Sequence, residues 1–235
     1  MKNALDVTVS ESLLLVLPRL LARVRSMFDL YCEPSEIYAA LSTMNGIKPG
    51  LCRLGTRLPG CFEFFELAAR AVLGQQITVR AAGTLAGRIA GAFGVPVVTG
   101  VDGLTHTFPP PEAILSLEGG AERRLGELGV ISARAAAMRT IAEKLVKREI
   151  NLGLCPSPEE EIKKLLEIRG VGSWTARYIA MRTMSWTDAF LETDAGIKKA
   201  LAGYAPKELF KMSEAWKPWR SYATVNIWNS LYKEG

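Results

Sequence analysis

The sequence predicts a mainly α-helical protein, and three observations support this fold class. Apolar residues recur at spacings of three and four through most of the 235 residues, which is the spacing of one face of a helix. Glycine or proline stands at the ends of many of these stretches, where helices begin and stop. Only Leu5–Val9 alternates in the manner of a strand. The length suits one large domain or two small lobes.

The expected helices follow from apolar periodicity and from end signals, taken in chain order. They run over 14–28, 62–73, 77–93 and 132–147, and from 158 onward. Gly74 and Gly94 would end the second and third, and Ser132 would cap the fourth. The last begins with a serine, a proline and three acidic residues, all of which favour a helix N-terminus. The one long irregular stretch, 94–111, is expected to connect two helical lobes.

Composition indicates an ordinary globular protein, with 49% hydrophobic and 23% charged residues. The longest aliphatic run, Leu13–Leu17, is too short to span a bilayer, and no secretory cleavage site follows it. We therefore expect a cytoplasmic protein without a membrane partner. The net charge of +5 is compatible with a polyanionic partner, although many basic proteins bind none.

Neither the cysteines nor the single histidine indicates a metal or acid–base centre. The four cysteines lack the paired short spacing of a disulfide scaffold, a zinc site or an iron–sulfur site. His106 lies in a proline-rich, turn-like stretch and is interpreted as a surface loop residue. A mechanism built on a histidine base is therefore not expected.

The most informative segment is 165–176, where an apolar helix end meets Gly170-Val171-Gly172 and a second helix begins at once. The two glycines permit backbone conformations that other residues avoid, so that the chain can turn within three residues. Val171 can fill the gap between the helices, and Ala176 lets them cross closely. Unpaired backbone N–H groups at the start of the second helix would suit a DNA phosphate. The alternative is an ordinary tight helix–helix turn.

Together with three other stretches, this hairpin resembles the helix–hairpin–helix DNA glycosylases, and specifically the DNA-3-methyladenine glycosylase II family. The stretches are 57–61, 71–76, 170–178 and 216–223 with Ile227-Trp228, and 188–194 joins the last two. The resemblance implies a two-lobed fold with a cleft between the lobes. A helical domain over 11–235 would comprise one lobe at 60–150 and another formed by 11–59 and 155–235. Residues 1–10 would be a remnant of a strand-rich N-terminal domain.

The resemblance assigns the catalytic carboxylate to Asp194, 24 residues after Gly170. An aspartate there would stabilise positive charge on the sugar as the base departs. From position alone, Thr193 or Asp194 would simply cap the following helix, and both roles can coexist. Lyase relatives carry a lysine nucleophile where Trp174 stands here. The resemblance therefore implies a monofunctional enzyme that hydrolyses the N-glycosidic bond of alkylated purines, such as 3-methyladenine and 7-methylguanine, without cutting the strand.

The resemblance also implies a base pocket and a set of DNA contacts. Trp174, Tyr178 and Trp228 would surround an extruded cationic base, which aromatic faces attract. Taken singly, each of these residues could equally pack in the core. The loop before the third helix would open the duplex; the family usually has an apolar wedge where Gln76 stands, and a polar helix-capping loop is the alternative. The expected DNA-binding residues are Gly170, Val171, Gly172, Thr175, Gln75 and Gln76.

The expected partner is duplex DNA with alkylated bases, bound by a monomer. No cofactor is expected, and the absence of a cysteine beyond Cys155 argues against the iron–sulfur cluster of some relatives. Whether a monovalent ion bridges the hairpin and a phosphate is left open. Two other hypotheses are a glycosylase for another lesion, such as a deaminated base, and a non-catalytic DNA-binding module that uses the hairpin as a phosphate clamp.

Overall fold

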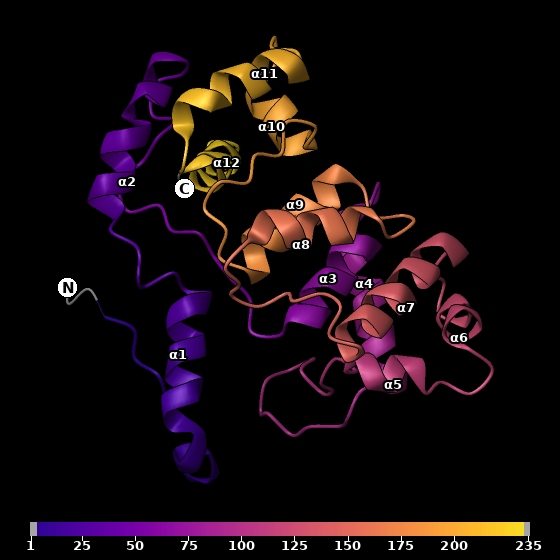
Figure 1. Cartoon of the computed structure of the whole chain (residues 1–235). Helices are drawn as coiled ribbons and strands as arrows, with labels where there is room; N and C mark the ends of the chain where they lie inside the picture. The colour runs from indigo at the N-terminus through magenta and orange to yellow at the C-terminus, as the bar shows by residue number, and fades with distance from the viewer. Residues whose placement is uncertain (1–3, 233–235) are drawn as a thin grey trace.

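The computed structural model describes residues 4–232 and confirms the mainly α-helical class (Figure 1). The helices are η1 (Glu11–Val16), α1 (Leu17–Met27), α2 (Pro34–Leu41), η2 (Ser42–Gly46), α3 (Phe64–Leu73), α4 (Val79–Phe93), α5 (Pro111–Leu115), α6 (Ala121–Glu127), α7 (Ser132–Val146), α8 (Pro158–Leu166), α9 (Ser173–Thr183), α10 (Ala195–Ala200), α11 (Pro206–Ser213), η3 (Glu214–Trp216) and α12 (Arg220–Asn229). No strand occurs within the described residues, where Pro96 and His106 form an isolated bridge.

Most expected helices occur close to their predicted bounds. Helix α3 ends at Gly74, and α4 begins after Thr78, whose hydroxyl accepts a hydrogen bond from Ala81 N–H at 3.2 Å. Helix α7 starts one residue early, because Ile131 occupies the cap position that was predicted for Ser132. End signals of this kind therefore located α3, α4 and α7 to within two residues, whereas the helix expected over 14–28 begins at Leu17, after the separate helix η1.

One expectation about the N-terminal region is wrong, and an apolar helix face there contributes no buried residue. Leu5–Val9 forms no strand and is mostly exposed, since no neighbouring strand within residues 4–232 offers the backbone groups that a sheet needs. The apolar face expected over 14–28 also fails to enter a core, because neither η1 nor α1 has a buried residue. Figure 1 shows α1 standing to one side of the remaining helices.

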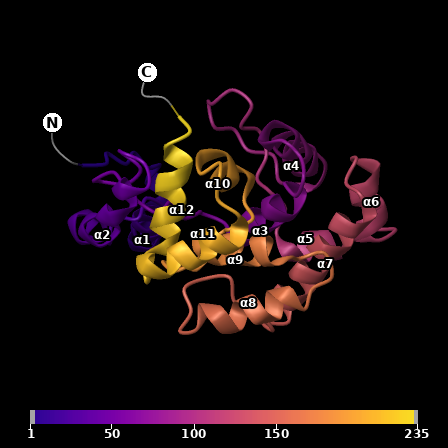
Figure 2. The ribbon, with the colours of Figure 1, turned by 90° about the horizontal axis from the view of Figure 1, so that it is seen from above.

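The buried side chains form two clusters, which are the cores of the two lobes. The first contains residues of α3, α4, α5, α6, α7, α8 and most of α9. The second contains residues of α2, η2, α10, α11, η3 and α12 together with parts of their connecting loops. Helix α9 lies between them, with Ile179 and Ala180 in the first cluster and Met181 in the second. Figure 2 shows α9 between the α3–α8 group and the α10–α12 group.

This arrangement differs from the expected division of the chain in two respects. The irregular stretch 94–111 connects α4 and α5 within the first cluster and does not join the lobes. The hairpin, which was expected in the lobe containing 155–235, packs in the first cluster through Leu165, Ile168 and Val171. The reason is that α9, on which α8 packs, lies against α3, and the hairpin at Gly170 lies against α7, so the crossing between lobes occurs along α9.

Helix α12 is fixed at its buried face by two polar side chains. The Tyr222 hydroxyl donates to Asp29 Oδ2 at 2.9 Å, and burial raises the pKa of that hydroxyl. Asn226 Oδ1 accepts from Arg53 N–H at 3.0 Å and from the Thr56 hydroxyl at 2.8 Å. These bonds tie α12 to segment 29–56 and so fix the position of the residues at its C-terminal end.

Candidate active site

The two glycines of the hairpin play different roles. Gly170 has φ +91°, a conformation that favours glycine, and a Cβ there would lie 3.5 Å from Ala133 O and from Ala137 Cβ. Gly172 has φ −87°, and a Cβ there would meet nothing within 4 Å. The expectation that both glycines serve the turn is therefore correct only for Gly170. At Gly172 the absent side chain leaves open space on the outer surface.

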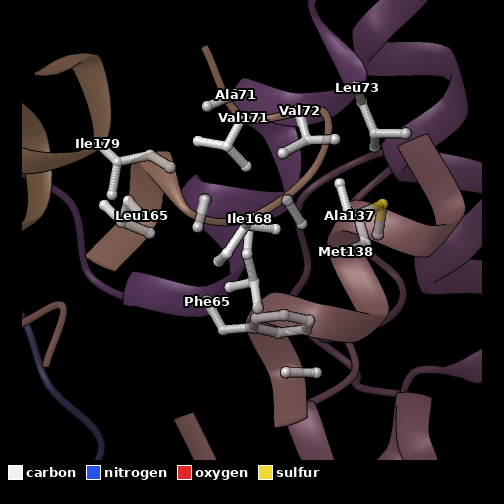
Figure 3. Close-up of a cluster of buried hydrophobic side chains, with 14 of the residues drawn as sticks. Phe65, Ala71, Val72, Leu73, Ala137, Met138, Leu165, Ile168, Val171 and Ile179 are labelled. Carbon is white, nitrogen blue, oxygen red and sulfur yellow. The ribbon is translucent and has the colours of Figure 1, made fainter. Parts of the chain in front are cut away.

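Val171 fastens the hairpin to the core and is not a free hydrogen-bond donor. Its side chain is 5% exposed and lies close to those of Val72 and Ile168 (Figure 3). Its backbone N–H donates to Ile168 O at 2.9 Å, so the turn itself uses this donor. No side chain caps α9, and Gly172 and Ser173 are exposed. Within residues 4–232 the N–H groups of Gly170 and Gly172 donate to no acceptor, so these two and the N–H groups of the first turn of α9 remain for an anion.

The loop before α4 contacts the hairpin through Gln75. Its amide nitrogen donates to Gly170 O at 2.9 Å and to Thr175 Oγ1 at 3.0 Å. Thr175 is 3% exposed and its hydroxyl accepts the bond from Gln75, so the expected DNA contact of Thr175 stays a prediction for which its backbone N–H is the available donor. Gln76 is exposed and has φ +55°. The two glutamines thus differ, one directed to the protein and the other to the surface.

Asp194 is the N-cap of α10, as its position predicted. Its Oδ1 accepts from Ile197 N–H at 3.0 Å and from Trp228 Nε1 at 2.8 Å, and its Oδ2 accepts from Trp174 Nε1 at 2.9 Å. The carboxylate is half-buried, and among residues 4–232 no ion pair involves it. Its negative charge is therefore held in place by neutral donors and not cancelled by a cation.

The three aromatic residues expected around a base lie together beside Asp194. The rings of Trp174 and Tyr178 are stacked, with centroids 5.0 Å apart and an interplanar angle of 6°. Tyr178 and Trp228 have centroids 6.4 Å apart and an angle of 55°. The guanidinium of Arg182 lies 5.6 Å from the Tyr178 ring centroid. Helices α9 and α12 thus supply aromatic faces and α10 supplies the charge.

A cleft of about 310 Å³ opens between α9 on one side and α3, the following loop and α4 on the other. Its lining residues are Leu67, Arg70, Ala71, Gly74, Ile77, Val79, Ala82, Gly83, Trp174 and Tyr178. The wall is mostly apolar, and Arg70 pairs with Glu66 at 2.7 Å. Asp194 and Trp228 are not among these lining residues. Trp174 connects the carboxylate to the cleft, since its ring lines the cleft and its N–H donates to Asp194 Oδ2.

Sequence reasoning missed two residues of this region. A Cβ at Gly196 would lie 3.0 Å from both Asp194 Oδ1 and Trp228 Cδ1, so glycine allows the indole to reach the carboxylate. The signal was a glycine in the first turn of a helix, which costs about 1 kcal/mol relative to alanine. Val79 lines the cleft although it is 92% exposed, and no sequence pattern distinguished it from other apolar residues of α4.

The metal-binding residue types and the cysteines were also placed by the structure. Within the described part of the chain, no three or more His, Cys, Asp or Glu side chains are grouped so that they could hold a metal ion. Burial raises the pKa of the Cys61 thiol to about 11, which keeps it protonated at neutral pH. Among residues 4–232, no helix combines the length and the apolar character needed to cross a bilayer.

Comparison with known proteins identifies relatives along the whole chain. A family model described as the AlkA N-terminal domain matches residues 1–63, through α1 and α2, whereas only residues 1–10 were expected in that domain. DNA-3-methyladenine glycosylase 2 of Escherichia coli K12 is 33% identical over 234 residues, which cover 100% of this chain and 78% of the relative.

Solved structures of similar fold include two 3-methyladenine DNA glycosylases. The protein from Archaeoglobus fulgidus has a TM-score of 0.67 and 22% identity, covering 96% of this chain and 77% of its own. Mag1 of Schizosaccharomyces pombe, solved in complex with abasic DNA, has a TM-score of 0.60 and 21% identity, covering 85% of this chain and 100% of its own. At these identities the structures establish that the fold is shared.

Proposed function

The chain belongs to the DNA-3-methyladenine glycosylase II family, within the helix–hairpin–helix DNA glycosylases, and we propose that it hydrolyses the N-glycosidic bond of alkylated purines in duplex DNA. The observation that carries this proposal is the carboxylate of Asp194, which two indole N–H groups hold beside an aromatic cleft without neutralising it. The substrates would include 3-methyladenine and 7-methylguanine. Membership of the family indicates the type of reaction, and the geometry around Asp194 is the basis for the mechanism proposed below.

The base would reach the site by leaving the stack. The N–H groups at the start of α9 bind a backbone phosphate and fix the register without reading sequence. Gln76, exposed on the neighbouring loop, enters the space that the base vacates. The extruded base then lies against the faces of Trp174 and Tyr178, which line the cleft. A base methylated at N3 or N7 is cationic, so that each aromatic contact contributes roughly 0.5–2 kcal/mol of attraction.

Bond cleavage then needs little acid catalysis. When the bond between the sugar and the base nitrogen breaks, its electron pair goes to the base and cancels the positive charge of the methylated ring. Positive charge develops on the sugar, and the carboxylate of Asp194 stabilises it. Water adds to the sugar carbon and loses a proton, which leaves an abasic site and a free base. Helix α10 holds the carboxylate in position by the bond from Ile197 N–H.

We propose that water, and not a side-chain amine, attacks the sugar. Lyase relatives carry a lysine at the position of Trp174, and here the indole at that position stacks on Tyr178 and donates to Asp194. No Schiff base would form and no strand would be cut. The protein would act as a monomer on DNA without a cofactor, with or without a monovalent ion between hairpin and phosphate.

The test is release of free base from a panel of duplexes. We expect the purified protein to release 3-methyladenine and 7-methylguanine from methylated duplex DNA and to leave the strand intact until alkali is added. Release of uracil or hypoxanthine alone would instead favour a glycosylase for deaminated bases. Binding of duplex without release of any base would favour a non-catalytic clamp.

A further inference from the structure

We propose that Gln75 is a positioning residue that ties the loop entering the duplex to the hairpin that anchors the phosphate. Base opening would then depend on a hydrogen bond network inside the protein, and not on a contact of Gln75 with DNA. This proposal rests on the proposed function, because it concerns how the protein opens the duplex before the bond is cut. It assigns Gln75 a role different from that of Gln76, its neighbour.

The first observation is the double use of the Gln75 amide. Its nitrogen donates to Gly170 O at 2.9 Å and to Thr175 Oγ1 at 3.0 Å, so that both of its hydrogens have acceptors on the hairpin and on α9. Thr175 is buried, and Gly170 has the left-handed backbone that defines the turn. The amide therefore bonds to the two ends of the phosphate-binding segment.

The second observation is that a third element holds the same residue. Arg134, on α7, donates a hydrogen bond to the backbone oxygen of Gln75. Helix α7 also approaches the hairpin directly, since Ala133 O and Ala137 Cβ lie at van der Waals distance from the position of a Cβ on Gly170. The loop, the hairpin and α7 thus form one polar junction on the surface of the first core.

The consequence concerns Gln76. A non-glycine residue at φ +55° is uncommon, and it persists only where neighbouring contacts determine the backbone. The contacts of Gln75 immediately before it supply that constraint. With Gln75 bonded to the hairpin, the Gln76 side chain has a fixed direction relative to the bound phosphate. Without these bonds the hairpin still anchors the DNA phosphate, but Gln76 no longer enters the duplex at a fixed position relative to that phosphate.

The experiment compares two duplexes of one sequence, one intact and one carrying a tetrahydrofuran abasic analogue. Both duplexes use the hairpin, but only the second offers a gap for the loop. The dissociation constant of the intact duplex divided by that of the abasic-analogue duplex therefore reports loop entry. We expect Gln75→Met, which keeps the length of the side chain and removes the donors, to lower this ratio about tenfold with intact-duplex affinity within about twofold of wild type. Thr175→Val should lower it about threefold and Thr175→Ser should restore it.

The matched control is Thr183→Val, at a second buried threonine of α9 whose hydroxyl bonds within its own helix to Ile179 O at 2.9 Å. This variant should keep the wild-type ratio. The proposal would be overturned if Gln75→Met left the ratio unchanged, or if it weakened both duplexes equally, as a loosened hairpin would. A further overturning result is additive losses in the Gln75→Met/Thr175→Val pair, because coupled partners lose less together. These results differ from failure of the proposed function, in which the wild-type protein releases no base.

Discussion

Asp188 and Asp194 lie six residues apart in the connection after α9, yet their surroundings differ in charge. Asp188 accepts two bonds from one guanidinium, with Oδ1 2.6 Å from Arg220 Nε and Oδ2 2.7 Å from Arg220 Nη2. Asp194 accepts its three bonds from a backbone N–H and two indole N–H groups. Both carboxylates are held firmly, but only the first is neutralised by a cation.

The difference teaches what an electrostatic catalyst requires. An arginine is the strongest partner for a carboxylate, but it also cancels the charge that a developing cation would feel. Neutral donors bind the carboxylate less strongly and leave its net negative charge uncancelled, next to the Trp174 ring that lines the cleft. Asp188 therefore suits a structural role between α9 and α12, and Asp194 suits the chemistry. Three predictions test this contrast and one tests the phosphate contact at the hairpin, ordered from the largest expected effect to the smallest.

Asp194→Asn should reduce the single-turnover rate of base release about a thousandfold, because the amide carries no charge to stabilise the sugar cation. Duplex affinity should remain near that of wild type, since Asn also accepts the bond from Ile197 N–H and can cap α10. Rapid-quench measurement of released base tests this. A rate equal to that of wild type would remove Asp194 from the mechanism.

Asp188→Asn should show the opposite pattern, with lost stability and retained chemistry. The pair is largely shielded, with side-chain exposures of 21% for Asp188 and 12% for Arg220. Removing one partner should lower the free energy of unfolding by about 2 kcal/mol. This is less than the cost of breaking a fully buried ion pair, because both side chains remain partly exposed to solvent. Urea denaturation measures this change, and the rate of base release by the folded variant should stay within about threefold of wild type. An Asp188→Asn variant with wild-type stability and no base release would contradict this account, because it would assign the chemistry to Asp188.

Gly172→Asp adds a carboxylate where DNA phosphate is expected. The backbone there has φ −87° and the Cβ position is open, so the fold should tolerate the change, and an acid at a helix N-terminus should favour α9. Duplex affinity should nevertheless fall about tenfold, because the new charge repels phosphate. Fluorescence anisotropy at several salt concentrations tests this, with Gly172→Ala as the neutral control. Equal affinities of the two variants would argue against phosphate at this turn.

Trp228→Phe should produce the smallest change, since the aromatic face remains while the donor to Asp194 Oδ1 is lost. Because Trp174 Nε1 and Ile197 N–H still hold the carboxylate and its charge remains, we expect the rate to fall only about fivefold to tenfold, with little change in substrate affinity. A loss seen only in affinity would show that this indole serves the base and not the carboxylate. Single-turnover rates across a range of protein concentrations separate the two.

Much of the fold could be predicted from local sequence, because helix ends carry local signals. Gly74, Gly94 and Pro158 each located a helix end, and the spacing of Gly170 and Gly172 located the hairpin. Asp194 as a helix cap also followed from position. These features depend on residues within a few positions of one another, so a single sequence contains the information.

What could not be predicted depends on contacts distant in the sequence. The Gln75 amide bonds to residues 95 and 100 positions away, and nothing local distinguishes it from Gln76. The convergence of Trp174 and Trp228 on one carboxylate requires the packing of three helices. The failed strand at Leu5–Val9 has the same cause, because alternation describes a residue pattern and a strand also needs a partner.

The most direct test of the contrast measures preference for positive charge at the sugar. A duplex with a protonated cyclic amine in place of one deoxyribose is compared with the neutral tetrahydrofuran duplex, since a mimic of the transition state should bind more tightly. Wild type and Asp188→Asn should prefer the cationic duplex by about a hundredfold, and Asp194→Asn should bind the two almost equally. If Asp194→Asn kept the full preference, the charge that stabilises the sugar would have to come from another residue.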